Sequence, residues 1–261
     1  EAWCNLGSAL EKLGRHTEAM DYYQRALRFN PGIPELHYNL GNMLQALGHH
    51  KEAERSYQEA IRLRPGYVEA HDHLGVVSAK QDRHEEAVAH YRRALTIRPD
   101  YATSHYNLAV SLKQLRRQDE AIESYRRALA INPRDTEALV NLGVVLAERH
   151  EFDEAIACYR DALRLKPDDT EAHSNLGNAL RGLGRLDEAI ASYRRAIALS
   201  PEYADAHFNL AIVLLLHDDF RHGWQEYQQR WGREISAGRP LPPSPWDGSN
   251  LNGKNVFLHT E

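Results

Sequence analysis

Fifteen histidines are the residues of this chain that most readily suggest chemistry, because imidazole binds transition metals and transfers protons near neutral pH. Five of them recur at multiples of 34 residues: His37, His71, His105, His173 and His207. Ligands of one metal ion must all lie about 2 Å from it, whereas equivalent positions of a helical repeat lie on helices about 8–10 Å apart. We therefore predict packing or hydrogen-bonding roles for these histidines, with no metal site.

A second series places an amide where a helix gains little from it, because asparagine competes for backbone hydrogen bonds. We call this series the asparagine row: Asn5, Asn39, His73, Asn107, Asn141, Asn175 and Asn209, with histidine in third place. An amide has one acceptor and two donors, so the row could pair with the C=O and N–H groups of an extended peptide. Alternatively, each amide bonds the neighbouring repeat and stabilises stacking. Both interpretations stay open here.

Other kinds of chemistry find little support in the sequence. We find no Ser-His-Asp arrangement beyond coincidence and no phosphate-binding loop, so we expect no enzyme and no cofactor. The net charge of −5 disfavours a nucleic-acid surface, and no apolar run approaches membrane-spanning length. Cys4 and Cys158 match no metal or redox spacing, which favours a reducing, cytoplasmic location. The chain has no signal peptide and begins at Glu1 without Met, so we expect a fragment.

The elements that must position these residues follow from the 34-residue period. Prolines recur at this step, as do a Leu-small pair, a Glu-Ala pair, a tyrosine and an alanine. The proline and tyrosine series are Pro31, Pro65, Pro99, Pro133, Pro167, Pro201 and Tyr23, Tyr57, Tyr91, Tyr125, Tyr159, Tyr193, Tyr227. A period of this length indicates a stacked array of small helical units.

Each unit reads as two helices joined by a turn. In the sixth unit, apolar residues at helical spacing predict a first helix over residues 171–183. Gly184 is a plausible C-terminal cap, Asp187 is the expected N-cap of the second helix, and Pro201 ends that helix. Gly177 would let the two helices approach closely while Tyr193 fills the space beside it.

The period, together with Leu6-Gly7, Ala19, Tyr23, Ala26 and Pro31, resembles the tetratricopeptide repeat family. The resemblance covers about residues 1–232 and implies an all-α fold, an α-solenoid with about seven helix-turn-helix repeats. These repeats start near residues 1, 34, 68, 102, 136, 170 and 204. It also implies a right-handed superhelix in which the first helix of each pair lines a concave groove.

The end of the chain departs from this pattern. Trp224, Tyr227 and Trp231 share one helix face, which predicts either a capping helix or a docking face for another domain. Residues 233–250 are rich in proline and read as an extended linker. Residues 251–261 look like the first strand of a truncated following domain.

Two narrower resemblances concern function. From the Trp-rich helix through Pro245-Trp246-Asp247-Gly248 to His259-Thr260-Glu261, the chain is similar to bacterial tetratricopeptide proteins with a glycosyltransferase-like domain. The asparagine row resembles the ladder in the repeat domain of O-linked N-acetylglucosamine transferases, which implies binding of an extended peptide. The row departs from that ladder at His73, which cannot copy the double contact of an amide.

Positions beside the row, placed in the groove by family analogy, extend this candidate site. They include Tyr38, Asn42, Tyr106, Asn178 and Phe208. None of the fourteen neighbouring positions holds Lys or Arg, which disfavours the clamp for a chaperone's terminal carboxylate found in other family members. We predict a scaffold that binds a protein or peptide in its groove, as the recognition region of a larger protein. The alternatives are a self-assembly module and the acceptor-recognition part of a glycosyltransferase.

Overall fold

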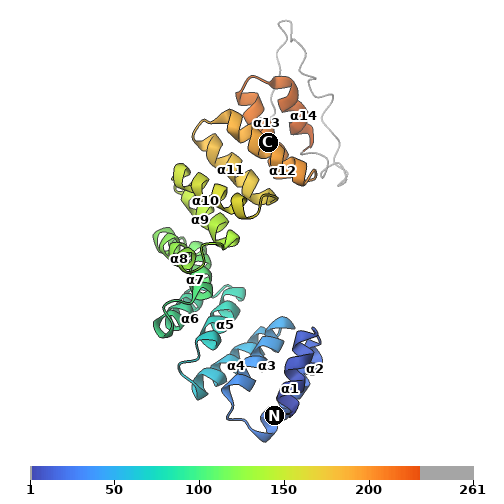
Figure 1. The fold of residues 1–261 in the computed structure, drawn as a ribbon, viewed down its shortest axis with the longest axis vertical. Coiled ribbons are helices and arrows are strands. Elements are labelled where there is room, and N and C mark those ends of the chain that lie inside the picture. The colour runs from blue at the N-terminus through green and yellow to red at the C-terminus, as the bar shows by residue number, and fades with distance from the viewer. Residues whose placement is uncertain (1, 230–261) are drawn as a thin grey trace. The chain divides into compact units, whose positions relative to one another are not determined.

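The computed structural model describes residues 2–229, which form fourteen α-helices and contain no strand (Figure 1). The all-α repeat fold predicted from the sequence is confirmed. The chain divides into two compact units, residues 1–133 and residues 134–261. The predicted linker at 233–250, the predicted strand at 251–261 and Trp231 lie outside the described residues.

The first unit holds four helix pairs. Their bounds are α1 (Ala2–Lys12), α2 (His16–Phe29), α3 (Pro34–Ala46), α4 (His50–Leu63), α5 (Val68–Lys80), α6 (His84–Ile97), α7 (Ala102–Gln114) and α8 (Gln118–Ile131). Within each pair the two helices pack along each other, and α2, α4 and α6 also pack on the first helix of the next pair. The chain order is therefore the packing order, as in a stacked array.

The described part of the second unit holds three more pairs. Their bounds are α9 (Thr136–Glu148), α10 (Phe152–Leu165), α11 (Thr170–Gly182), α12 (Leu186–Leu199), α13 (Ala204–Leu216) and α14 (Phe220–Gln229). The packing follows the same order as in the first unit, and α11 also contacts both α9 and α13 directly. First helices of successive repeats thus approach one another along one side of this unit, which we call the first-helix face.

The seam within five of the seven described helix pairs depends on a glycine and a tyrosine. A Cβ atom on Gly177 would lie 2.6 Å from Cε1 of Tyr193, and Gly41 stands in the same relation to Tyr57. Both tyrosines are fully buried. The close approach predicted from Gly177 and Tyr193 is confirmed, because only a residue without a side chain leaves room for the ring.

The turn inside each pair requires a left-handed residue. Gly14, Gly48 and Gly184 have φ angles of 72°, 80° and 74°, which confirms the predicted glycine cap at Gly184. Four repeats place a residue with a Cβ atom at this position: Asp82, Arg116, His150 and Asp218, with φ between 60° and 62°. An L-residue in this conformation is strained by roughly 1–2 kcal/mol.

The predicted N-cap at Asp187 is wrong. The second helix of that repeat begins at Leu186, its N-cap is Arg185, and Asp187 lies in the first turn. The left-handed Gly184 reverses the chain so sharply that the helix starts two residues later. Arg185 instead anchors the helix start through Nε, which donates to Oε1 of Glu188 at 2.7 Å. True side-chain caps occur at Asp135 and Asp169, before α9 and α11.

Candidate functional site

Side chains of the asparagine row lie on the first helices and are partly exposed in both units. Asn5 is exposed, while the other five asparagines and His73 are partly buried. The residues three positions later, such as Asn42 and Asn178, share this face and are also partly buried. The leucine and the small residue that follow each row residue are buried from the third repeat onward, as Leu74 and Gly75 are. The row is therefore accessible along the first-helix face of each unit.

At Asn107 the amide bonds the neighbouring repeat. Its Nδ2 lies 3.3 Å from both carboxylate oxygens of Asp72, one repeat earlier. The hydroxyl of Ser104 donates to the same carboxylate at 2.6 Å. Asp72 is only 2% exposed, and this burial raises the pKa of its carboxyl group although both hydrogen bonds oppose the shift. Here the stacking interpretation of the row applies.

His73 takes part in a second junction between repeats. Its Nε2 lies 3.2 Å from the hydroxyl of Tyr38, and its Nδ1 lies 3.3 Å from the hydroxyl of Tyr57. The Tyr57 hydroxyl donates to Oδ1 of Asn42 at 2.8 Å or to Oε1 of Gln45 at 2.9 Å. The proton of His73 therefore belongs on Nδ1, and Nε2 accepts from Tyr38. Burial lowers the pKa of His73, which favours this neutral form.

Tyrosine hydroxyls orient the amides beside the row. As Tyr57 does with Asn42, Tyr193 donates its hydroxyl proton to Oδ1 of Asn178 at 2.8 Å. This occupies the acceptor oxygen of each amide, so only its Nδ2 group can make further contacts as a donor. Sequence reasoning treated these tyrosines only as packing residues. The recurring 15-residue spacing between amide and tyrosine was a signal that could have shown the contact.

Comparison with known families and structures decides the family. A family model described as Cilia and flagella-associated protein 70 C-terminal domain matches residues 34–237. A second, described as Tetratricopeptide repeat, matches residues 1–32. The chain belongs to this tetratricopeptide repeat family. No protein of curated function matches the sequence.

Solved structures share the tetratricopeptide repeat fold. YrrB, "a TPR protein with an unusual peptide-binding site", is 23% identical with a TM-score of 0.63, over 70% of this chain and 95% of YrrB. MamA is 24% identical with a TM-score of 0.61, over 66% of this chain and 93% of MamA. The pilF protein of Pseudomonas aeruginosa is 19% identical with a TM-score of 0.69, over 78% of this chain and 93% of pilF. At these identities the likeness shows the fold alone.

The five repeat-spaced histidines serve the turns between tetratricopeptide repeats. Each Nε2 lies 2.8–3.1 Å from the carbonyl oxygen of the proline six residues earlier, as His37 does with Pro31. The predicted hydrogen-bonding role is thus confirmed, and the partner that all five share is a turn carbonyl. His207 also contacts the neighbouring helix α14, where its Nδ1 lies 2.5 Å from Oε2 of Glu226. Within residues 2–229, no three or more His, Cys, Asp or Glu side chains are grouped to hold a metal.

Aromatic residues of the candidate site pair with tyrosines of the second helices. The Tyr106 and Tyr125 rings lie 5.9 Å apart, and the Phe208 and Tyr227 rings 6.1 Å apart. Trp224 contacts Tyr227 edge to face at 5.6 Å. In the last tetratricopeptide repeat these aromatics therefore pack on one another, as a capping helix requires. The docking role predicted for Trp224, Tyr227 and Trp231 stays a prediction.

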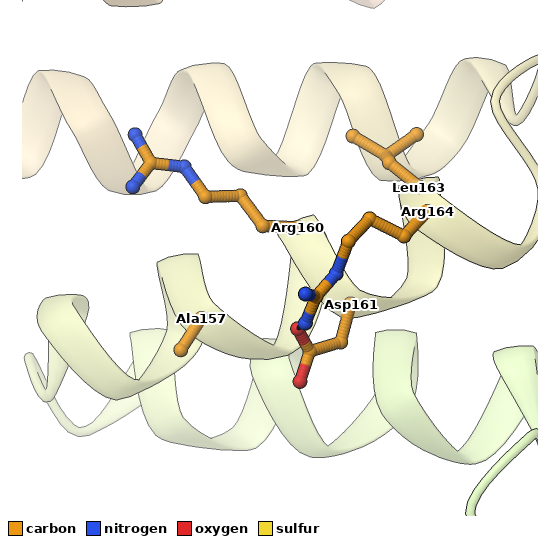
Figure 2. A pocket seen from close by; sticks show the side chains of 5 residues that line it. All are labelled: Ala157, Arg160, Asp161, Leu163 and Arg164. Carbon is orange, nitrogen blue, oxygen red and sulfur yellow. Dashed lines mark hydrogen bonds and ion pairs between the residues drawn. The ribbon is translucent and has the colours of Figure 1, made fainter.

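A surface hollow of about 560 Å³ lies on α10, a second helix, whereas the asparagine row lies on first helices (Figure 2). Ala157, Leu163 and the stems of Arg160 and Arg164 line it, all from one second helix. Arg160 donates to Glu188 of the next tetratricopeptide repeat at 3.1 Å, and Arg164 pairs with Asp161. Because both guanidinium groups already have carboxylate partners, this hollow has no unsatisfied charge to attract a ligand.

No helix in residues 2–229 combines the length and the apolar character that crossing a membrane demands.

Proposed function

We propose that this chain is a protein-interaction scaffold whose first-helix face binds an extended peptide or partner segment. The observation that carries the proposal is the lack of hydrogen bonds at the side chains of Asn39 and Asn175 within the described residues. Within residues 2–229 neither side chain has a hydrogen-bond partner, although both are partly buried on the first-helix face. Each amide can therefore accept from the N–H and donate to the C=O of a bound backbone.

The row is not uniform in this proposal. At Asn107 the amide donors are already directed to Asp72, and at His73 both ring nitrogens face tyrosines. We therefore assign backbone contacts to Asn39 and Asn175 and a supporting role to Asn107 and His73. YrrB, whose structure is described as having an unusual peptide-binding site, supports peptide recognition by this fold.

A library of immobilised extended peptides tests this function. We expect a subset to bind, and we expect Asn39→Ala with Asn175→Ala to weaken every captured peptide about tenfold, because neutral hydrogen bonds each contribute about 0.5–1.5 kcal/mol. Gln24→Ala is the matched control, since Gln24 is an exposed amide on the second helix α2. Unchanged affinity in the double variant would contradict the proposal.

Self-association is the second candidate, and exposed apolar side chains of the first repeat favour it. Large apolar side chains are exposed there: Trp3 37%, Leu6 42%, Leu13 70% and Phe29 77%. Sedimentation at several concentrations tests this role, and a strict monomer throughout would remove it.

Recognition of acceptors for a glycosyltransferase is the third hypothesis. It depends on the stretch from the Trp-rich helix to Glu261, of which residues 230–261 lie outside the described part of the chain. Reading the encoded sequence beyond Glu261 would decide it, since a Gly-rich strand–turn–helix pattern supports the transferase and a stop codon removes it. The cytoplasmic location also stays a prediction.

A further inference from the structure

A buried carboxylate joins the third and fourth repeats beside the asparagine row. Asp72 on α5 accepts a hydrogen bond from the Ser104 hydroxyl of α7 at 2.6 Å, and both of its oxygens lie 3.3 Å from Nδ2 of Asn107. Ser104 is fully buried and Asp72 is nearly so. Burying a charged carboxylate is unfavourable unless hydrogen bonds compensate, so these two donors stabilise Asp72 in its place.

Asp72 and Ser104 both depart from the repeat pattern, and the two departures meet. Asp72 stands where the other repeats have residues without a carboxylate: Cys4, Tyr38, Tyr106, Val140, Ser174 and Phe208. Ser104 stands where the other repeats have alanine or leucine: Ala2, Leu36, Ala70, Ala138, Ala172 and Ala206. Because residues without a charge suffice for stacking at the other junctions, the carboxylate at this junction indicates a role besides packing.

The charge of Asp72 determines which end of the Asn107 amide remains free. An ionised carboxylate only accepts hydrogen bonds, so Asn107 must approach it with Nδ2 and not with Oδ1. Within residues 2–229 the Oδ1 atom of Asn107 has no hydrogen-bond partner, and the side chain is partly buried on the first-helix face. Asn107 therefore offers a ligand an acceptor. Asn42, whose Oδ1 accepts from Tyr57 at 2.8 Å, offers a donor instead.

We infer that Asp72 is a positioning residue, which fixes Asn107 as an acceptor for a backbone N–H group of the bound segment and releases it when Asp72 takes up a proton. A neutral carboxyl group has both a donor and an acceptor, so the amide can then pair with it in either orientation. The inference deepens the proposed peptide binding and rests on it. It adds a one-sided contact at Asn107 to the two-sided contacts assigned to Asn39 and Asn175.

The surroundings of Asp72 favour proton uptake above the ordinary range of an aspartate. Burial raises the pKa of the Asp72 carboxyl group, while the hydrogen bonds from Ser104 and Asn107 and the charge of His73 oppose the rise. Other titratable groups within electrostatic reach are Glu69, which Arg98 neutralises at 2.9 Å, and the tyrosines Tyr38, Tyr91 and Tyr101. Burial also raises the pKa of each of these tyrosines, so they stay protonated while Asp72 titrates.

Peptides captured from the library test the acceptor role when each backbone N–H is replaced in turn by N-methyl. At pH 7.5 we expect one N-methylation to weaken binding to the wild type about three- to tenfold, and Asp72→Asn to remove most of that loss. The two changes form a double-mutant cycle, so the steric cost of the methyl group cancels. Independent losses at every position overturn the inference and leave the proposed function standing, whereas capture of no peptide overturns both.

Two control variants separate the charge of Asp72 from damage to the junction. Ser104→Ala disturbs the same buried cluster but leaves the carboxylate with Asn107, so the cost of that N-methylation should persist. Ser174→Ala, at the equivalent position of the second unit, should also leave the cost unchanged.

Acidification tests the release of Asn107. Lowering the pH from 7.5 to 4.5 should reduce the cost of the N-methylation in the wild type and not in Asp72→Asn, which has no carboxyl group at this position. An equal response of the two proteins to acidification, or loss of the cost in Ser104→Ala, would overturn the inference.

Discussion

The Cε1 atom of Tyr57 lies 2.5 Å from the position that a Cβ atom would take on Gly41. No real Cβ contact is this short, so the glycine determines how closely α3 and α4 pack. The fourth repeat has Ala109 and Tyr125 at these positions, both fully buried, so its helices accommodate one methyl group. The seam is therefore adjusted repeat by repeat.

We predict that Gly41→Ala destabilises the first unit by about 1–3 kcal/mol, because the buried Tyr57 ring must move from a fully packed site. Urea denaturation measures the change. Gly66→Ala is the matched control, since a Cβ atom there meets nothing within 4 Å and the φ angle is not positive. Equal effects of the two substitutions would contradict the role assigned to the seam.

The left-handed turns lead to a prediction of increased stability. Arg116 has a φ of 60° and is exposed, so Arg116→Gly should stabilise the protein by about 1 kcal/mol through relief of backbone strain. Gly48→Ala, at a φ of 80° in an equivalent turn, should destabilise it by a similar amount. Thermal unfolding of the two variants measures both shifts, and a loss of stability in Arg116→Gly would refute the strain.

The histidines His71 and His90 predict a pH effect on stability. Nδ1 of His207 lies 2.5 Å from Oε2 of Glu226, whereas His90 stands at the position equivalent to Glu226 in the repeat of His71. Nδ1 of His71 has no hydrogen-bond partner within residues 2–229. Burial, followed by the charge of nearby groups such as Arg93, lowers the pKa of His71, and burial also lowers that of His90.

Because the folded state lowers both pKa values, the unfolded state binds more protons below the ordinary imidazole pKa of about 6.5. Stability should therefore fall as the pH drops from 7.5 to 5.5. His90→Glu should give His71 a carboxylate partner, raise its pKa and weaken or reverse this fall. Denaturation at the two pH values and NMR titration of His71 provide the measurements. An unchanged titration of His71 would show that residue 90 does not face it.

Two positions of the asparagine row should separate stability from binding. Asn107→Ala removes one of the partners that hold the buried Asp72 carboxylate, so we expect a loss of about 1–2 kcal/mol. Asn175→Ala removes no intramolecular hydrogen bond within residues 2–229 and should leave stability within about 0.5 kcal/mol. Urea denaturation of both variants measures the two changes in stability. Equal losses would contradict the assignment of Asn107 to stacking and of Asn175 to binding.

Much of the fold could be predicted because the residues that determine the turns and seams contact partners close to them in sequence. The left-handed turn at Gly184 and the fit of Gly177 against Tyr193 both join residues close in sequence, and the period repeats the signal. The start of α12 was misplaced because Asp187 is a much better side-chain cap than Arg185, while the left-handed turn at Gly184 places the N-cap at Arg185.

The candidate site was harder to predict, because its contacts join neighbouring repeats. The sequence alone determined the repeat, the helix pairs and the existence of the asparagine row, since these depend on side-chain type and spacing. Only the tertiary structure decided that Asn107 bonds Asp72 while Asn175 stays unbonded within the described residues. Those partners stand one repeat away, and an amide's orientation depends on whichever side chain the stacked helix brings beside it.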